Sequence, residues 1–199
     1  MNKSFSLSDY EMAVANDKEF LFTKTRIIEK VYSVFGNLAD DFAIHLNHSF
    51  QKIEAGTPKI SKGENYKGLP YVVLDYPRIF QKENVLAIRC FFWWGNFFSI
   101  TLHLSGKYKH EFTPALQHAI NENYFQGWYI NVADKQWEHH FETDNYSLIN
   151  SSLANSFAGR PFIKFAKKIP LSEWDNVEDF FIKNFQILLK AISNQAPIR

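Results

Sequence analysis

Apolar residues recur at three- and four-residue steps near both ends of the chain, and strand-like apolar segments fill much of the middle. The first helical repeat covers residues 20–42, and its apolar face holds Ile27, Ile28, Val31, Phe35, Leu38 and Phe42. Gly36 and Asn37 interrupt this stretch, yet the hydrophobic phase continues through them. The spacing therefore predicts one long helix with a weak point, because a 3.6-residue period keeps these side chains on one face.

Three further helices are predicted, and the C-terminal one has the clearest pattern. Its apolar stripe consists of Trp174, Val177, Phe181, Phe185, Leu188 and Ile192, which makes the helix amphipathic. Thr113 followed by Pro114 is typical of an N-cap and a first helical residue, so we expect a short middle helix over residues 113–123. A short helix is also expected to begin near Ser8, where acidic residues follow in the first turn.

Strand patterns occupy most of the remaining chain. They cover residues 71–76, 85–93, 97–105 and 124–132, with weaker ones at 136–141 and 162–167. Residues 49–68 lack periodicity and combine lysines with glycines and a proline, which predicts a loop. Short links between consecutive strands favour antiparallel pairing.

The predicted fold class is therefore α+β. We expect an antiparallel sheet of about five or six strands, with a long N-terminal helix, a short middle helix and a C-terminal amphipathic helix packed on it. No linker is evident between these elements, so residues 1–199 are expected to form a single domain.

Residues 85–105 are compatible with two registers of a central hairpin. A two-residue turn at Gly95 and Asn96 places Arg89 among leucine and isoleucine side chains, where an unpaired guanidinium is costly to bury. A three-residue loop over residues 94–96, with Asn96 in the left-handed conformation, makes one face of the hairpin fully apolar. We therefore predict the three-residue loop.

The opposite face of this hairpin is the candidate functional surface. Its candidate ligand-binding residues are Arg89, Phe91, Trp93, Ser99, Thr101 and His103. Aromatic walls with a few polar groups on a rigid sheet are typical of a ligand site, and Arg89 is suited to a bidentate pair with a carboxylate or phosphate. The alternative is structural: a helix or loop covers this face, and Arg89 pairs with an internal acid such as Asp75.

Composition and charge argue against several classes of protein. Lys and Arg number 22 against 21 Asp and Glu, for a net charge of +1, which does not indicate the basic surface that nucleic-acid binding needs. No apolar run reaches the ~18 to 20 residues of a membrane-spanning helix. The first residues lack the apolar core of a signal peptide, so we expect a soluble, cytoplasmic protein that binds neither nucleic acid nor membrane. Cys90 is the only cysteine and lies on the apolar face of the predicted hairpin, so we expect a buried, unreactive thiol.

No motif identifies a reaction. A phosphate loop, a nucleotide-binding glycine fingerprint and a nucleophile elbow are all absent, and no metal or cofactor is predicted. The sequence favours a binding or interaction protein that presents the candidate face to a small anionic or aromatic ligand, or to a partner. The alternative is a small-substrate enzyme with His103 as base and Arg89 as substrate anchor, which requires a carboxylate that orients His103. We expect a monomer or a homodimer, with the aromatic hairpin tip at Trp93 and Trp94 as one self-association surface.

Overall fold

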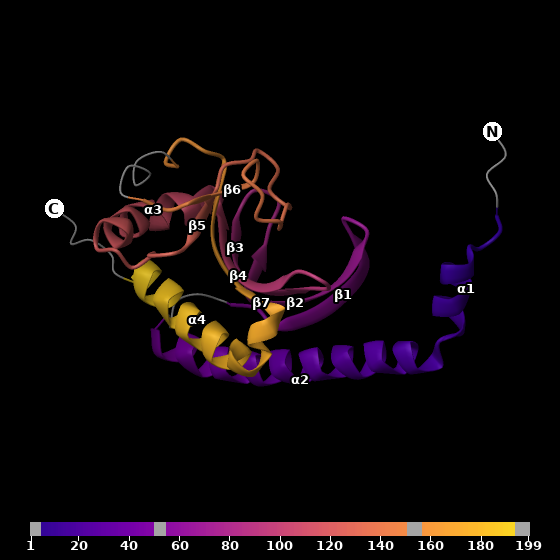
Figure 1. Cartoon of the computed structure of the whole chain (residues 1–199). Helices are drawn as coiled ribbons and strands as arrows, with labels where there is room; N and C mark the ends of the chain where they lie inside the picture. Colours follow the sequence, from indigo (N-terminus) through magenta and orange to yellow (C-terminus); the bar gives the residue numbers. More distant parts are fainter. Residues whose placement is uncertain (1–4, 50–54, 151–156, 194–199) are drawn as a thin grey trace.

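A computed structural model describes residues 5–49, 55–150 and 157–193 (Figure 1). This part of the chain has the predicted α+β fold. Its antiparallel sheet has seven strands, more than the predicted five or six, in the order β1-β2-β3-β4-β7-β5-β6. All neighbouring strands pair antiparallel. The helices are α1 (Asp9–Asn16), α2 (Lys18–Ser49), α3 (Gly106–Asn121), the 3₁₀ helix η2 (Leu171–Asn176) and α4 (Val177–Ser193). The strands are β1 (Lys59–Tyr66), β2 (Leu69–Phe80), β3 (Val85–Trp93), β4 (Phe97–Ser105), β5 (Tyr129–Asn131), β6 (Tyr146–Leu148) and β7 (Phe162–Pro170).

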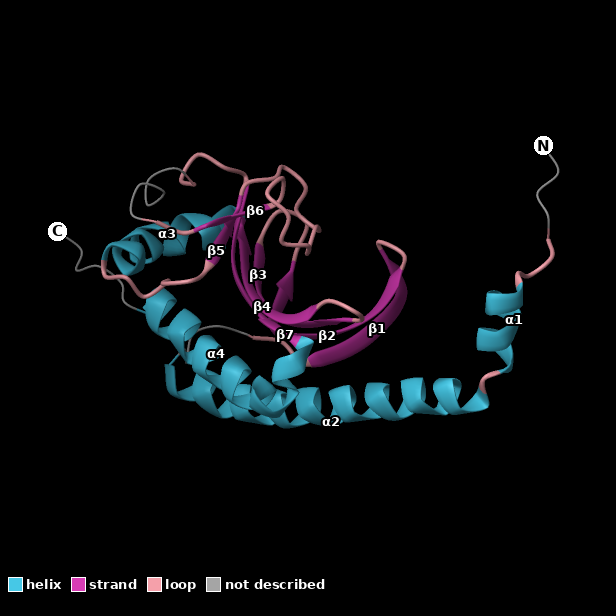
Figure 2. Cartoon of the chain, viewed as in Figure 1, coloured by secondary structure: helices cyan, strands magenta, loops and turns pink. Residues whose placement is uncertain are grey.

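The sheet is strongly curved, and α2 and α4 lie against its convex side (Figure 2). The main hydrophobic core lies between the helices, α3 included, and one face of the sheet. The predicted stripes of α2 and α4 meet there: the rings of Phe42 and Phe185 stack at 3.7 Å between centroids, and Phe35 meets Phe181 edge-on. α2 runs unbroken through Gly36, as its hydrophobic phase predicts.

The central hairpin has the predicted three-residue loop. Trp93 pairs with Phe97 across β3 and β4, which leaves residues 94–96 as the loop. The left-handed residue is Gly95, with φ at 68°, and not Asn96 as predicted. Glycine adopts this conformation without the steric penalty of a Cβ atom. The apolar face of the hairpin is buried in the main core, and Cys90 is buried there with the rest.

The middle helix is longer than predicted. α3 begins directly after β4, and Thr113 lies inside it, where its hydroxyl donates to the carbonyl of Lys109 at 2.6 Å. The Thr-Pro pair is typical of a helix start because Pro114 forgoes one backbone hydrogen bond. Phe112 and Leu116 are buried on either side of Pro114, so packing stabilises the helix across the proline.

Three other segments differ from their predictions. Residues 59–66, predicted as a loop, form the edge strand β1, whose polar composition suits an edge that faces water. Residues 136–141, predicted as a weak strand, form no strand and belong to the connection between β5 and β6. The strand predicted over residues 124–132 is reduced to β5. Residues 50–54 of the predicted loop lie outside the described residues.

Candidate functional site

The six predicted site residues all lie on the face of β3 and β4 that points away from the main core. A second hydrophobic cluster forms on this face, made of Val73, Phe91, Trp93 and Phe97 with Tyr66, Tyr71 and Phe141 against it. Residues 132–145, which connect β5 to β6, cross above the concave side of the sheet and form the covering segment (Figure 1). Trp137 of this segment packs on His103, and Phe141 packs on Phe97, at centroid distances of 5.2 and 5.1 Å.

Arg89 is paired inside the protein. Its Nε donates to Oδ1 of Asp75 at 2.7 Å and its Nη2 donates to Oδ2 at 2.9 Å. The two residues are direct neighbours across β2 and β3, so the sheet itself holds the bidentate geometry. Of the two arrangements considered from the sequence, pairing with Asp75 is the one observed. The charge of the guanidinium is therefore balanced before any ligand arrives.

His139 of the covering segment completes the surroundings of Arg89. The Nη1 of Arg89 lies 3.0 Å from Nε2 of His139. Because a guanidinium only donates, Nε2 accepts this hydrogen bond and His139 is neutral. Burial, followed by the nearby charge of Arg89, lowers the pKa of His139 well below its ordinary value.

His103 lies under the covering segment rather than in an open site. Burial, followed by the charges of Lys164 and Arg89, lowers the pKa of His103 to about 3. Its Nε2 has no hydrogen-bond partner, and no carboxylate among the described residues hydrogen-bonds to the ring. The acid-base alternative needs a carboxylate that orients this imidazole, and the observed geometry does not supply one.

Tyr66, at the end of β1, fastens the covering segment to the sheet. Its hydroxyl accepts the backbone N–H groups of His139 at 2.7 Å and of His140 at 3.0 Å, and donates to Oε2 of Glu138 at 3.1 Å. Burial raises the pKa of Tyr66 to about 12. Lys164 of β7 adds a second fastening, since its buried Nζ donates to the carbonyl oxygen of Glu138. The segment is thus held by side chains from two distant strands.

A cavity of about 290 Å³ remains between the covering segment and strands β1 to β3. This aromatic cavity is lined by Ser61, Tyr66, Tyr71, Val73, Arg89, Phe91, Trp137 and His139. Of the six predicted site residues, only Arg89 and Phe91 line it. The other four, Trp93, Ser99, Thr101 and His103, are buried and do not line the cavity.

Gly63 sets the position of one wall. A Cβ atom on Gly63 would lie 2.4 Å from Cζ of Tyr71, so the absence of a side chain there leaves room for the Tyr71 ring. The hydroxyl groups of Tyr71 and Ser61 have no hydrogen-bond partner among the described residues. Both residues line the cavity.

Several cavity residues were not predicted from the sequence. Ser61 and Tyr66 lie in a segment predicted as a loop, and Trp137 and His139 lie in one predicted as a weak strand. The available signal was the density of aromatic and imidazole side chains over residues 137–141, which is high for a connection between strands. The contact between that segment and Tyr66 spans more than seventy residues, a distance over which periodicity carries no information.

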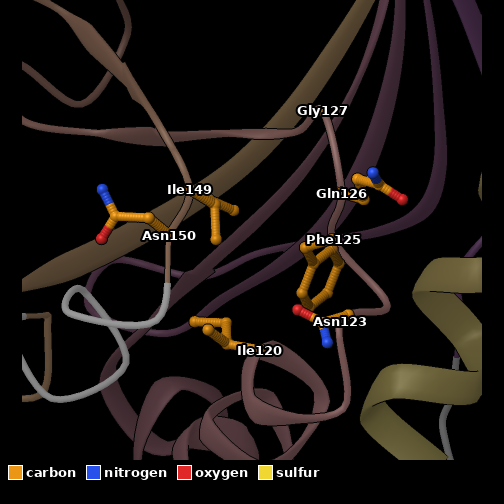
Figure 3. Close-up of a pocket in the computed structure, with 7 residues that line it drawn as sticks. All are labelled: Ile120, Asn123, Phe125, Gln126, Gly127, Ile149 and Asn150. Atoms are coloured by element: carbon orange, nitrogen blue, oxygen red, sulfur yellow. The ribbon is translucent and has the colours of Figure 1, made fainter.

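A second cavity, of about 410 Å³, lies beside the C-terminal end of α3 (Figure 3). Ile120, Phe125 and Ile149 face it, whereas the amides of Gln126 and Asn150 extend away from the other labelled side chains (Figure 3). None of the described residues that line this cavity is ionisable. It offers a ligand less chemistry than the aromatic cavity does.

Comparisons with protein-family models, with curated proteins and with solved structures find no match to this chain. None of the helices in residues 5–49, 55–150 and 157–193 combines the length and apolar character needed to span a membrane. Within the same ranges, no three His, Cys, Asp or Glu side chains are grouped so that they could hold a metal ion.

Proposed function

We propose that this protein binds a small, uncharged aromatic compound in the aromatic cavity. The observation that carries the proposal is the preformed space of about 290 Å³, which lies near the lower end of the volumes typical of ligand sites, roughly 300–1,000 Å³. A space of this size accommodates a one- or two-ring molecule.

The walls of the cavity favour a flat apolar ligand. Phe91 lies 5.6 Å from the ring of Tyr71 and 5.1 Å from that of His139, at tilted angles. Rings at such distances attract one another through offset and edge-to-face contacts, and an aromatic ligand extends the same arrangement. The hydroxyls of Ser61 and Tyr71 supply hydrogen bonds that orient it.

The charge balance of the site supports an uncharged ligand over an anion. Both carboxylate oxygens of Asp75 already accept hydrogen bonds from Arg89, and an anion would have to compete with this pair. Arg89 also donates to His139, so its hydrogen bonds are largely used. An interaction with an uncharged aromatic ring requires none of these bonds to break.

The test is titration of the ¹⁵N-labelled full chain with indole, phenol, benzoate and inorganic phosphate, followed by backbone NMR. We expect indole and phenol to shift amides of β1, β2 and the covering segment with dissociation constants of about 1 mM or below, a range set by the small size of these probes. Tyr71→Ala should weaken binding at least about fivefold, since one of the aromatic side chains that line the cavity is lost. Ser61→Ala, a smaller change, should weaken phenol more than indole.

Tyr10→Ala is the matched control, because Tyr10 is an exposed tyrosine of α1 and its loss should leave binding unchanged. Saturable binding of benzoate or phosphate with no binding of phenol would overturn the uncharged ligand in favour of an anion. Absence of saturable shifts from every probe, or shifts unaffected by both Tyr71→Ala and Ser61→Ala, would overturn the cavity as the site.

A further inference from the structure

The N-terminal part of the chain packs little on the rest of the described residues, although Lys24 forms an ion pair with Glu64 of β1 at 3.1 Å. Between residues 5 and 30 no residue is buried, and Val31 is the first that is. Figure 1 shows α1 and the start of α2 extending beyond the sheet. We define residues 5–26 as the N-terminal arm.

The arm exposes an unusual amount of aromatic surface. Phe5 is 97% exposed, Tyr10 78%, Phe20 51% and Phe22 59%. An aromatic side chain has roughly 150–250 Å² of surface, so these four rings present on the order of 500 Å². Exposed apolar surface of this extent is typical of interaction sites on soluble proteins.

α1 also needs an external source of stability. It has a complete capping box, in which the Ser8 hydroxyl accepts the N–H of Glu11 and the Glu11 carboxylate accepts that of Ser8. It has only 8 residues and none of them is buried. Helices shorter than roughly 12–15 residues are marginal in water, and tertiary packing normally stabilises them. The sequence defines the start of this helix, but no residue of the helix is buried against the part of the chain that the structure describes.

An apolar groove of about 350 Å³ lies beside the hairpin tip, at the point where α2 first packs on the domain. This hairpin groove is lined by Ile27, Lys30, Phe92, Trp94, Leu171 and Trp174. The Nε1 of Trp94 is buried without a hydrogen-bond partner. The groove offers apolar surface on which the aromatic side chains of the arm can pack.

We propose that the N-terminal arm of one chain packs into the hairpin groove of a second copy, and that the exchange is reciprocal about a two-fold axis. Burial of the exposed aromatic surface of two arms against equal areas of their partners would remove at most about 2,000 Å² from water, a total within the range of stable protein–protein interfaces. In a closed two-fold exchange, the arm and the hairpin groove of each copy are both covered by the other copy. No arm or groove then remains exposed to bind a third copy.

Charge supports this partner over a lipid surface. α1 carries Asp9 and Glu11 and no basic residue, while Lys30 is the charged residue that lines the groove. The arm as a whole has four acidic residues, Asp9, Glu11, Asp17 and Glu19, against Lys18, Lys24 and Arg26. Amphipathic helices that bind anionic membranes are instead rich in basic residues.

The test is the oligomeric state of the full chain by sedimentation velocity over about 1 to 100 µM, a range that brackets a micromolar dissociation constant. We expect a dimer, and the double substitution Tyr10→Ala and Phe22→Ala should raise its dissociation constant at least about tenfold. The matched control is Ile44→Ala with Leu148→Ala, which removes two equally exposed apolar side chains elsewhere and should leave the dimer intact.

Mixing two defective variants distinguishes arm-in-groove exchange from contact between two arms. The arm variant is the double substitution Tyr10→Ala and Phe22→Ala, and the groove variant is Ile27→Ala with Lys30→Glu. Each should be chiefly monomeric alone at a concentration at which the unsubstituted protein is a dimer. A mixture of the two should form a heterodimer, because one intact arm still meets one intact groove. Thermal unfolding of each variant shows whether it is folded.

Three outcomes would overturn the proposal. The first is a wild-type monomer at about 100 µM, the second a dimer that the arm variant leaves unchanged, and the third a mixture that forms no heterodimer. Binding of the monomer to vesicles of phosphatidylcholine and phosphatidylglycerol, lost with Phe22→Ala, would assign the arm to a membrane instead. None of these results depends on the aromatic cavity, which the arm does not line.

Discussion

Arg89 and Arg26 each form an ion pair, and the two pairs differ chiefly in burial. The side chains of Arg89 and Asp75 are 19% and 7% exposed, whereas those of Arg26 and Glu19 are 55% and 76% exposed. Exposed ion pairs contribute only about 0–1 kcal/mol, because water screens them. Removal of one partner from a buried pair leaves an uncompensated charge and is strongly destabilising. The same residue type therefore has different roles at the two positions.

We predict that Arg89→Ala lowers the free energy of unfolding by about 3 kcal/mol, because it leaves Asp75 buried without its bidentate partner. Urea denaturation at pH 7 measures the change. Arg26→Ala is the matched control and should leave the free energy of unfolding nearly unchanged, because water screens its exposed pair with Glu19. A neutral or stabilising effect of Arg89→Ala would contradict a structural role and return Arg89 to the set of ligand-binding residues.

At the scale of secondary-structure elements, Gly36 and Gly95 provide a matched pair. A Cβ atom meets no other atom within 4 Å at either position, so the two sites differ in backbone conformation and not in space. Gly36 lies inside α2 with a helical backbone, whereas Gly95 has φ at 68° in the hairpin loop.

We predict opposite effects of alanine at these two glycines. Gly36→Ala should raise the free energy of unfolding by about 0.5–1 kcal/mol, because alanine loses less backbone freedom in a helix. Gly95→Ala should lower it by roughly 1–2 kcal/mol, since an L side chain is strained in the left-handed region. Chemical denaturation of both variants measures the two signs. A loss of stability in Gly36→Ala would show that α2 needs a weak point at this position.

The elements predicted well from the sequence are those with one buried face, because burial separates apolar from polar residues along the strand or helix. β3 and β4 have the predicted bounds, and their register follows from a clean partition of apolar and polar residues, with Arg89 kept out of the main core. The covering segment was mispredicted because its order comes from distant side chains, above all from Tyr66. β1 was missed because an edge strand in water needs no apolar alternation. Candidate site residues on β3 and β4 were therefore identifiable, and those on the covering segment were not.

For the whole molecule, the polar groups under the covering segment couple folding to pH. Burial lowers the pKa of His103 to about 3 and that of Lys164 to about 7, from ordinary values of 6.5 and 10.5. Both side chains are bases, and the folded state favours their neutral forms over their charged forms. Between the lowered and the ordinary pKa of each group, the unfolded chain binds more protons than the folded one. The free energy of unfolding therefore rises with pH over these two pH ranges.

We predict two ranges of rising stability, between about pH 3 and 6.5 from His103, joined by His139, and between about pH 7 and 10.5 from Lys164. Each group contributes a slope of up to about 1.4 kcal/mol per pH unit. Lys164→Met should remove the slope above pH 7, because methionine keeps the length of the side chain without its charge. Most of the acidic slope should remain, because burial is a larger cause of the lowered His103 pKa than the charge of Lys164. Lys107→Met, at an exposed lysine of α3, is the matched control and should leave both slopes unchanged. Urea midpoints measured from pH 4 to 10 separate the two contributions. A flat profile above pH 7 in the unsubstituted protein would mean that Lys164 stays charged beneath the covering segment, and that its ammonium is stabilised there by the Glu138 carbonyl.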